Sequence, residues 1–431
     1  MTPVHSLTSP PALLLWAWLA VAAIRALPIL DFIEPVSIDV WLVLGACYAA
    51  FSAAFALTCR PIWPAAPVPR RLPAPITSLV YAFSATGLIG ALARGIDFYF
   101  LRGLDYSEGL GAVRLANVEL VGEEAGARGL AAIGRILIAF STVAAMATIL
   151  RFEALSKGAR CAALGSLAVA VAVSILEGGR NTLAINLALM ACCFLIRWLV
   201  GKPAIPGGLV GRAGLAGVAI VAVVFFSYIF VDRSEALGRS LADALTALEA
   251  SFNVQVSEQL KDADGGLLLG AAVSLAGLAL YVGNGVNELN WVMEWLNANS
   301  LAMGAYNLDM PVVALQRMGF DVARFNADLL YRPGVYITAF GELMLDFGVA
   351  GTVLILGLIG AAVGRAWYLA RRRDSIGMEL GLAFAVAWLI ATPLYSIVAG
   401  FFSVLLAVAV FSLAIAARRP RAGLHVRPVH G

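Results

Sequence analysis

The chain has 431 residues, of which 61% are hydrophobic and 13% are charged, and its formal net charge at pH 7 is +3. This composition is far too apolar for a water-soluble fold of such length, so it excludes that class and predicts a polytopic membrane protein. Its apolar runs continue for roughly 18 to 21 residues without the polar alternation of a barrel strand, which predicts an all-α fold. The net charge itself decides little, because in membrane proteins the positions of lysine and arginine carry the information.

Ten apolar stretches are long enough to span a bilayer as helices. They lie at about 12–30, 40–58, 76–93, 130–150, 161–177, 182–199, 213–231, 345–368, 379–396 and 400–417. Alternate loops are basic and contain Arg60, Arg70, Arg71, Arg151, Lys157, Arg160, Arg197, Lys202, Arg212, Arg371, Arg372, Arg373, Arg418, Arg419 and Arg421. By the positive-inside rule these loops and both termini are predicted to be cytoplasmic. We therefore expect three parts, namely helices 1 to 7 in residues 1–231, an external loop region in 232–336, and helices 8 to 10 with a cytoplasmic tail in 337–431.

The external region at 232–336 is large enough to form a small domain. The helical spacing of apolar residues from Leu241 to Phe252 predicts an amphipathic helix, which lies either on the outer membrane face or on the core of the loop itself. On length alone, the apolar stretch 267–282 qualifies as an eleventh span. An eleventh span would place Arg371–Arg373 outside, so we expect a re-entrant or interfacial segment there.

An amide-rich and aromatic tract follows this segment. Its asparagines and tryptophans suit sugars, because aromatic rings stack on pyranose faces and amides match hydroxyl groups. The glycan-binding candidates are Asn284, Asn287, Trp291, Trp295 and Tyr336. An interfacial aromatic belt explains the tryptophans as well, and the sequence leaves both interpretations open.

Several kinds of chemistry are missing from the predicted outer loops. His5, His425 and His430 lie in the predicted cytoplasmic tails, so the outer side has no histidine relay and no histidine metal site. The sequence contains no Walker A motif and no glycine-rich loop that opens a soluble nucleotide-binding unit. We therefore expect no cofactor and no nucleic-acid partner, and an activated substrate that arrives by another route, such as a lipid-linked donor.

The short link Glu177–Asn181 places an acid and a base between two apolar runs. Charges at the rim of a bilayer usually pair with each other or bind something. The guanidinium of Arg180 matches phosphate oxygens, and the start of the following helix adds backbone N–H groups to such an anion site. A tight turn with a structural pair of Glu177 and Arg180 is the alternative.

Four further arginines are candidates for binding the same anion. Arg135 lies inside the fourth predicted helix, where snorkelling toward the interface is the alternative role. Arg317, Arg324 and Arg332 share a face if their region is helical, although an ordinary solvated face explains such charges as well.

A second charged stretch opens the eighth predicted helix. Glu342 and Asp346 are four residues apart, so they lie on one helix face. A single helix from Thr338 to Leu369 would measure about 48 Å at about 1.5 Å per residue, beyond a hydrocarbon thickness of about 30 Å. Its first turns then project outward, and one carboxylate, with Glu177 in reserve, is the candidate general base. Two solvated interfacial acids are the alternative interpretation.

Further along this helix, small residues that allow close helix packing are expected at Gly357, Gly360 and Gly364.

At these two stretches the sequence resembles the bacterial O-antigen and exopolysaccharide repeat-unit polymerases of the Wzy type. The resemblance rests on Gly178-Gly179-Arg180 after a hydrophobic helix, on Thr338-Ala-Phe-Gly-Glu-x-x-x-Asp346-Phe-Gly-x-x-Gly351, and on a multi-span layout with a large external loop. It implies a glycosyltransferase on the periplasmic face of the inner membrane. Such an enzyme releases the growing glycan from undecaprenyl pyrophosphate and joins it to a fresh lipid-linked repeat unit. The arginines would hold the diphosphate, a carboxylate would take the acceptor proton, and a chain-length regulator is a candidate partner.

Two other function classes stay open. O-antigen ligases share this kind of architecture but typically carry an external histidine, whereas the three histidines here lie in predicted cytoplasmic tails, so a polymerase is favoured over a ligase. A transporter or lipid flippase would show paired halves with broken helices at corresponding positions. No such repeat is visible in the sequence.

Overall fold

The computed structural model covers most of the predicted helices. It describes residues 8–27, 30–60, 76–104, 128–176, 181–205, 254–257, 267–304, 337–372, 375–394 and 397–417, with Asn307 and scattered positions between 106 and 116 and between 208 and 249. The predicted part boundaries at 231 and 336, and the predicted span 213–231 apart from two residues, lie outside the described residues.

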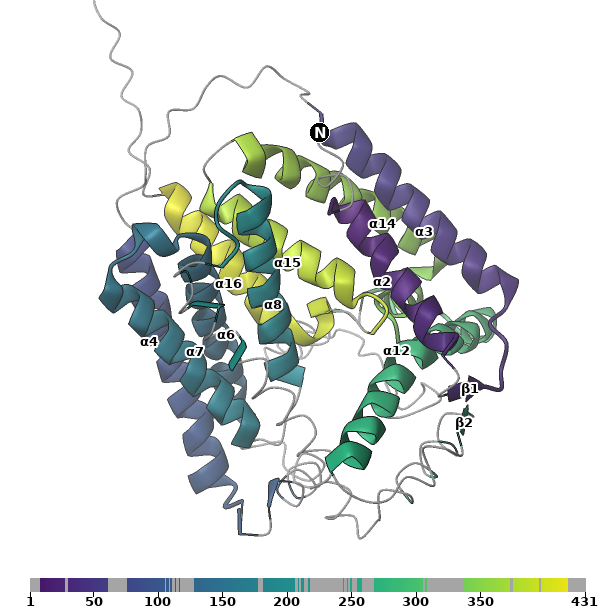
Figure 1. Ribbon diagram of the computed structural model, residues 1–431, viewed down its shortest axis with the longest axis horizontal. Helices are drawn as coiled ribbons and strands as arrows, with labels where there is room; N and C mark the ends of the chain where they lie inside the picture. Colours follow the sequence, from purple (N-terminus) through teal and green to yellow (C-terminus); the bar gives the residue numbers. More distant parts are fainter. Residues whose placement is uncertain are drawn as a thin grey trace, which may run out of the picture.

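The described chain is a bundle of α-helices with two very short strands (Figure 1). The helices are α2 (Pro10–Arg25), α3 (Ile38–Thr58), α4 (Ile76–Ile96), α6 (Arg128–Leu150), α7 (Lys157–Leu176), α8 (Asn181–Leu199), α12 (Leu267–Ala298), α14 (Ala339–Arg372), α15 (Ile376–Ala391) and α16 (Ile397–Ala417). A π-helical turn η1 (Asp97–Leu101), a 3-10 turn η2 (Phe152–Ala154), and the strands β1 (Leu30–Phe32) and β2 (Val254–Val256) complete the set.

The all-α prediction is confirmed, and nine of the ten predicted stretches contain a helix. Among the described residues, six helices are long and apolar enough to cross a membrane. These six are α3, α4 with η1, α6, α7, α8 and α14. Helices α2 and α15 are apolar but shorter, so the figure of about ten spans stays a prediction.

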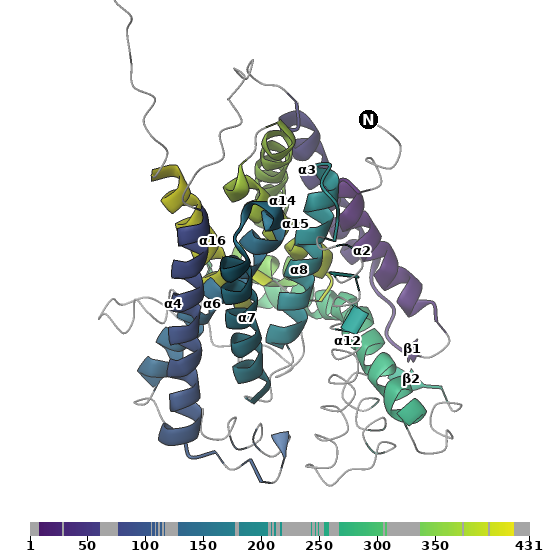
Figure 2. The same ribbon diagram turned by 60° about the vertical axis from the view of Figure 1, so that its left-hand side comes forward.

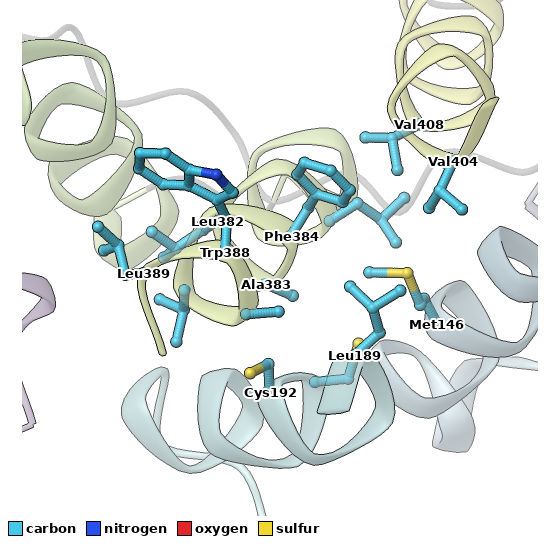
Figure 3. Close-up of a cluster of buried hydrophobic side chains, with 14 of the residues drawn as sticks. Met146, Leu189, Cys192, Leu382, Ala383, Phe384, Trp388, Leu389, Val404 and Val408 are labelled. Atoms are coloured by element: carbon cyan, nitrogen blue, oxygen red, sulfur yellow. The ribbon is translucent and has the colours of Figure 1, made fainter. Parts of the chain in front are cut away.

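Helix α15 lies inside the bundle, between α8, α14 and α16, and its apolar side chains form much of the core (Figures 1 and 3). Trp388 and Phe384 of α15 are buried in the same cluster as Leu189 of α8 and Met146 of α6. Phe83 of α4 continues this core, with its ring centroid 4.9 Å from that of Phe411 in α16. A helix that is apolar on all sides is expected in such a position.

Two pairs of helices approach closely because glycines remove the side chains between them. A Cβ atom at Gly87 or Gly90 of α4 would overlap with α6, and one at Gly360 would lie 2.3 Å from the carbonyl oxygen of Phe51 in α3. At Gly364 the nearest atom, Oγ1 of Thr58, would also be 2.3 Å away. The predicted packing role of Gly360 and Gly364 is therefore confirmed, since only glycine fits at this distance.

The link between α2 and α3 pairs with the long excursion that follows α8. β1 and β2 are antiparallel, with Leu30 opposite Val256 and Phe32 opposite Val254. Nearby, the side-chain amide of Asn290 in α12 accepts a hydrogen bond from the N–H of Ser37 at 3.1 Å. These contacts place the two segments at the same end of the bundle.

The expected re-entrant or interfacial placement of the stretch 267–282 stays a prediction. That stretch and the amide-rich tract after it form a single helix, α12, of 32 residues. The stretch from Leu267 to Ala298 contains no proline, so nothing in it interrupts the hydrogen-bond ladder. Figure 2 shows α12 running from the bundle toward β1 and β2.

Two arginines that were counted as loop charges are buried in ion pairs where α6 and α8 end. Arg151 forms an ion pair with Glu379 of α15, in which Nη2 lies 2.9 Å from Oε1. Arg197, which has no exposed surface, donates to Glu153 at 3.1 Å and to the carbonyl oxygen of Ile149 at 2.8 Å. Both arginines therefore tie helices together and cap the last carbonyls of α6.

Candidate functional site

The first turn of α14 is held in place by a capping residue and by the end of α15. Thr338 accepts a hydrogen bond from the N–H of Gly341 on its hydroxyl at 3.1 Å, and Ala339 donates its N–H to the carbonyl oxygen of Thr392 at 2.9 Å. Threonine is a favoured helix cap because its oxygen satisfies one of the free N–H groups of the first turn. A Cβ atom at Gly341 would lie 3.0 Å from Leu289 of α12, so the glycine lets α12 and α14 pack together.

Both predicted carboxylates of α14 are buried inside the protein. Glu342 is 5% exposed and Asp346 is fully buried, so the alternative of two solvated interfacial acids is wrong. The predicted single helix from Thr338 to Leu369 is also wrong, because Gly348 adopts φ 69° and ψ 178° and breaks the helix. The continuous helix after Gly348 runs about 36 Å, close to the thickness of a bilayer core, and the turn with Glu342 is a separate short helix before it.

Asp346 has a structural partner. Its Oδ2 atom accepts hydrogen bonds from the backbone N–H and the side-chain amide of Asn307, at 2.9 and 2.8 Å. Its carbonyl oxygen accepts from the N–H of Met303, and the neighbouring carbonyl of Leu345 accepts from Ala302. Asp346 thus holds the segment after α12 against the break in α14, which leaves Glu342 as the base candidate of the pair.

A second buried polar group lies on α12, and we call Asn284, Asn287 and Glu288 the polar row. They are 2%, 3% and 5% exposed. The side-chain amide of Asn284 donates to Oε1 of Glu288 at 2.8 Å, which orients the amide oxygen away from this contact. Within the described part of the chain, no donor reaches the Oδ1 atoms of Asn284 and Asn287. Two buried acceptors without donors are costly, so they mark the row as a place for a ligand with hydroxyl or other donor groups.

Glu288 was missed by the sequence reasoning. Its sequence position could have indicated it, because Glu288 comes one helical turn after Asn284 and the residues next to it in the chain are apolar or carry amides. The predicted glycan-binding tryptophans continue the same side of α12. Trp291 and Trp295 are partly buried, and Trp295 packs against the main core.

The polar row lies next to the first turn of α14. A Cβ atom at Gly285 of α12 would be 2.8 Å from the carbonyl oxygen of Pro393 and 3.0 Å from the methyl group of Thr338. The row and the Glu342 turn thus belong to one layer, where α12, α14 and the end of α15 meet. In the described residues no group of three or more His, Cys, Asp or Glu is arranged to hold a metal ion.

Arg135 is on α6 and is exposed, and it is accompanied by arginines that the prediction did not include. A Cβ atom at Gly134, the residue before it, would lie 2.5 Å from Cγ of the buried Arg94. The guanidinium carbons of Arg94 and Arg102 lie 5.1 and 5.0 Å from the centroid of the Phe98 ring, in the π-helical turn. Arg102 also forms an ion pair with the buried Asp97 of the same turn, with Nε 2.8 Å from Oδ2, so part of the positive charge is neutralised there. Such π turns often occur at functional sites.

Six predicted site residues lie outside the described residues, namely Glu177, Arg180, Arg317, Arg324, Arg332 and Tyr336. The helices on either side of the Glu177–Arg180 link are in place, since α7 ends at Leu176 and α8 starts at Asn181. The start of a helix directly after Arg180 agrees with the predicted anion site, which itself stays a prediction.

Comparisons with known proteins found no matching family model, no matching curated protein and no matching solved structure.

Proposed function

We propose that this protein is a lipid-carrier-dependent glycosyltransferase of the bacterial inner membrane. It would polymerise oligosaccharide repeat units linked to undecaprenyl pyrophosphate on the periplasmic face. The observation that carries the proposal is the buried polar row of α12 together with the buried Glu342, which lies in the first turn of α14 where that turn packs against α12. Ionisable residues in such bundles are usually retained for function, and Asp346, whose role is structural, illustrates the exception.

In the proposed reaction, a hydroxyl oxygen of the acceptor repeat unit attacks the anomeric carbon of the donor glycan. A new glycosidic C–O bond forms while the bond between that carbon and the diphosphate oxygen breaks. Glu342 takes the proton of the attacking hydroxyl, and the undecaprenyl pyrophosphate leaves with its electron pair. Asn284 and Asn287 would accept hydrogen bonds from sugar hydroxyls, and Arg135 and the predicted Arg180 would stabilise the charge on the leaving diphosphate.

The test is turnover in liposomes that contain the purified protein and lipid-linked repeat units, without nucleotide. We expect a ladder of glycan lengths. The Glu342→Gln variant should lose about 100- to 10,000-fold in rate, the usual contribution of a general base. Glu294→Gln is the matched control, because Glu294 is on the same helix as the polar row but is exposed.

Unchanged turnover by Glu342→Gln would remove the base assignment. If the wild-type protein moves glycan across the bilayer without lengthening it, the protein is a transporter and the polymerase proposal is wrong.

A further inference from the structure

The opposite end of α14 lies beside the end of α3. The two helices run in the same direction, since Gly360 faces Phe51 and Gly364 faces Thr58 (Figures 1 and 2). The ring of Trp367 in α14 follows at 6.3 Å from that of Phe55 in α3. Consequently the residues just after α3 lie next to the last turns of α14.

Four arginines lie at this end, namely Arg60, Arg365, Arg371 and Arg372. We call these arginines, together with Trp367 and Tyr368, the basic cluster. The guanidinium carbons of Arg365 and Arg372 lie 5.4 and 5.0 Å from the centroid of Tyr368, and that of Arg371 lies 5.7 Å from the centroid of Trp367. Contacts of this kind hold a flexible guanidinium in a defined position.

The pKa of the Cys59 thiol indicates that Arg60 belongs to the cluster. Cys59 caps the end of α3. Burial raises the pKa of this thiol, while the positive charges of Arg371 and Arg60 act in the opposite direction and lower it. Both arginines must therefore lie close to Cys59, and so to each other.

Among the described residues, the buried donors of the basic cluster have no acceptors. Nη1 of Arg365, Nε1 of Trp367 and the hydroxyl of Tyr368 are buried without a hydrogen-bond partner in the part of the chain that is described. The ion pairs among described residues involve Arg102, Arg151, Arg197 and Lys202, and no described carboxylate pairs with the four arginines of the cluster. Arg60, Arg371 and Arg372 are exposed at this end, so their positive charges beside the three buried donors suit an anion with several oxygens, such as a phosphate.

The exposed surface of α14 that precedes the basic cluster indicates which kind of molecule would carry this phosphate. Leu354 and Leu358 are 65% and 63% exposed. They precede Arg365 by 11 and seven residues, which places all three within about 40° on one helix face. Arg372 continues the same line. An exposed apolar stripe that ends in arginines and a tyrosine has the arrangement of acyl chain and headgroup in a lipid.

We propose that this face of α14 binds one anionic phospholipid. Its phosphate is held by Arg365 and Arg372, whose guanidinium groups are positioned by the ring of Tyr368, and an acyl chain lies along Leu354 and Leu358. The site is at the far end of α14 from Glu342, and the inference does not depend on the proposed reaction.

The test measures lipid binding to the full-length protein in a neutral detergent. Phosphatidylglycerol is titrated and the melting temperature and the number of bound lipids are recorded, with phosphatidylcholine and inorganic phosphate as separate arms. We expect saturable binding of one phosphatidylglycerol. The Arg365→Gln/Arg372→Gln variant should bind it about 25-fold more weakly, since each basic residue near an anionic headgroup contributes about a factor of five.

The matched control is Lys157→Gln/Arg212→Gln, which removes two exposed charges from the same predicted side and should leave binding unchanged. Tyr368→Leu removes the ring that positions both guanidinium groups and keeps their charges, so it should weaken binding several-fold even if the double variant folds poorly. Equal binding of phosphatidylcholine, full reproduction of the effect by inorganic phosphate, or equal losses in the control variant would each overturn the proposal.

Discussion

Replacing Asp346 by alanine tests whether this residue stabilises the fold at the break in α14 or takes part in catalysis. In the wild-type protein Oδ2 of Asp346 accepts two hydrogen bonds from Asn307, and alanine leaves both donors without an acceptor. Hydrogen bonds to a charged group contribute about 1.5–3 kcal/mol each, so the free energy of unfolding should fall by about 3–6 kcal/mol. Activity should fall only in proportion to the loss of folded protein.

The assay is unfolding by sodium dodecyl sulfate in detergent micelles, followed by tryptophan fluorescence, with turnover measured per folded molecule. Asn307→Ala removes the side-chain donor but keeps the backbone N–H, so a double-mutant cycle with Asp346→Ala isolates a single hydrogen bond. Its coupling energy should be about 1.5–3 kcal/mol. Glu342→Gln should behave in the opposite way, with nearly wild-type stability and little turnover.

Unfolding of Asp346→Ala at the same detergent concentration as the wild-type protein would contradict the structural role of Asp346. The assignment of the two carboxylates would be reversed if the folded Asp346→Ala protein had no turnover while the folded Glu342→Gln protein were fully active.

Two further predictions concern the packing and the ion pairs. Gly364→Val forces a side chain against the backbone of Phe55 and should destabilise the protein by about 1–3 kcal/mol, whereas Gly357→Ala, which meets only one atom at 4.0 Å, should be tolerated in the same unfolding assay. The hydrogen bond from Arg197 holds the pKa of Glu153 below its ordinary value of 4.5. A lowered folded-state pKa stabilises the protein above the unfolded-state pKa and is lost as the pH falls through the folded-state value. The stability difference between the wild-type protein and Glu153→Gln should therefore be constant near neutral pH, shrink below about pH 4.5 and vanish in stronger acid; a difference that grows in acid would contradict it.

The helices could be predicted from the sequence because the physical constraint is local. A backbone inside a bilayer must satisfy its own hydrogen bonds, so a long apolar run that enters the bilayer folds into a helix. Gly360 and Gly364 belong to the same class of prediction. Two glycines four residues apart in an apolar run lie on one face, and the α3 backbone indeed lies against that face.

The roles of the charged residues could not be predicted in the same way, because a role depends on partners that are distant in the chain. Glu342 and Asp346 look equivalent in sequence, and the contact with Asn307, 39 residues away, separates them. Arg151 and Arg197 look like loop charges, and their pairing with Glu379 and Glu153 makes them buried ties between helices.

By itself the sequence determined an all-α architecture, the positions of nine helices and the stretches where charge meets apolar surface. Hydrophobic length and periodicity act over a few residues, and these patterns are complete in the chain. Only the tertiary structure decided that α12 is continuous and that α14 breaks at Gly348. It also showed that Glu288 joins Asn284 and Asn287 in a buried row, and that donors without partners gather around Tyr368. Those features are set by which helices pack together, since burial and unsatisfied hydrogen bonds exist only once the neighbours are in place.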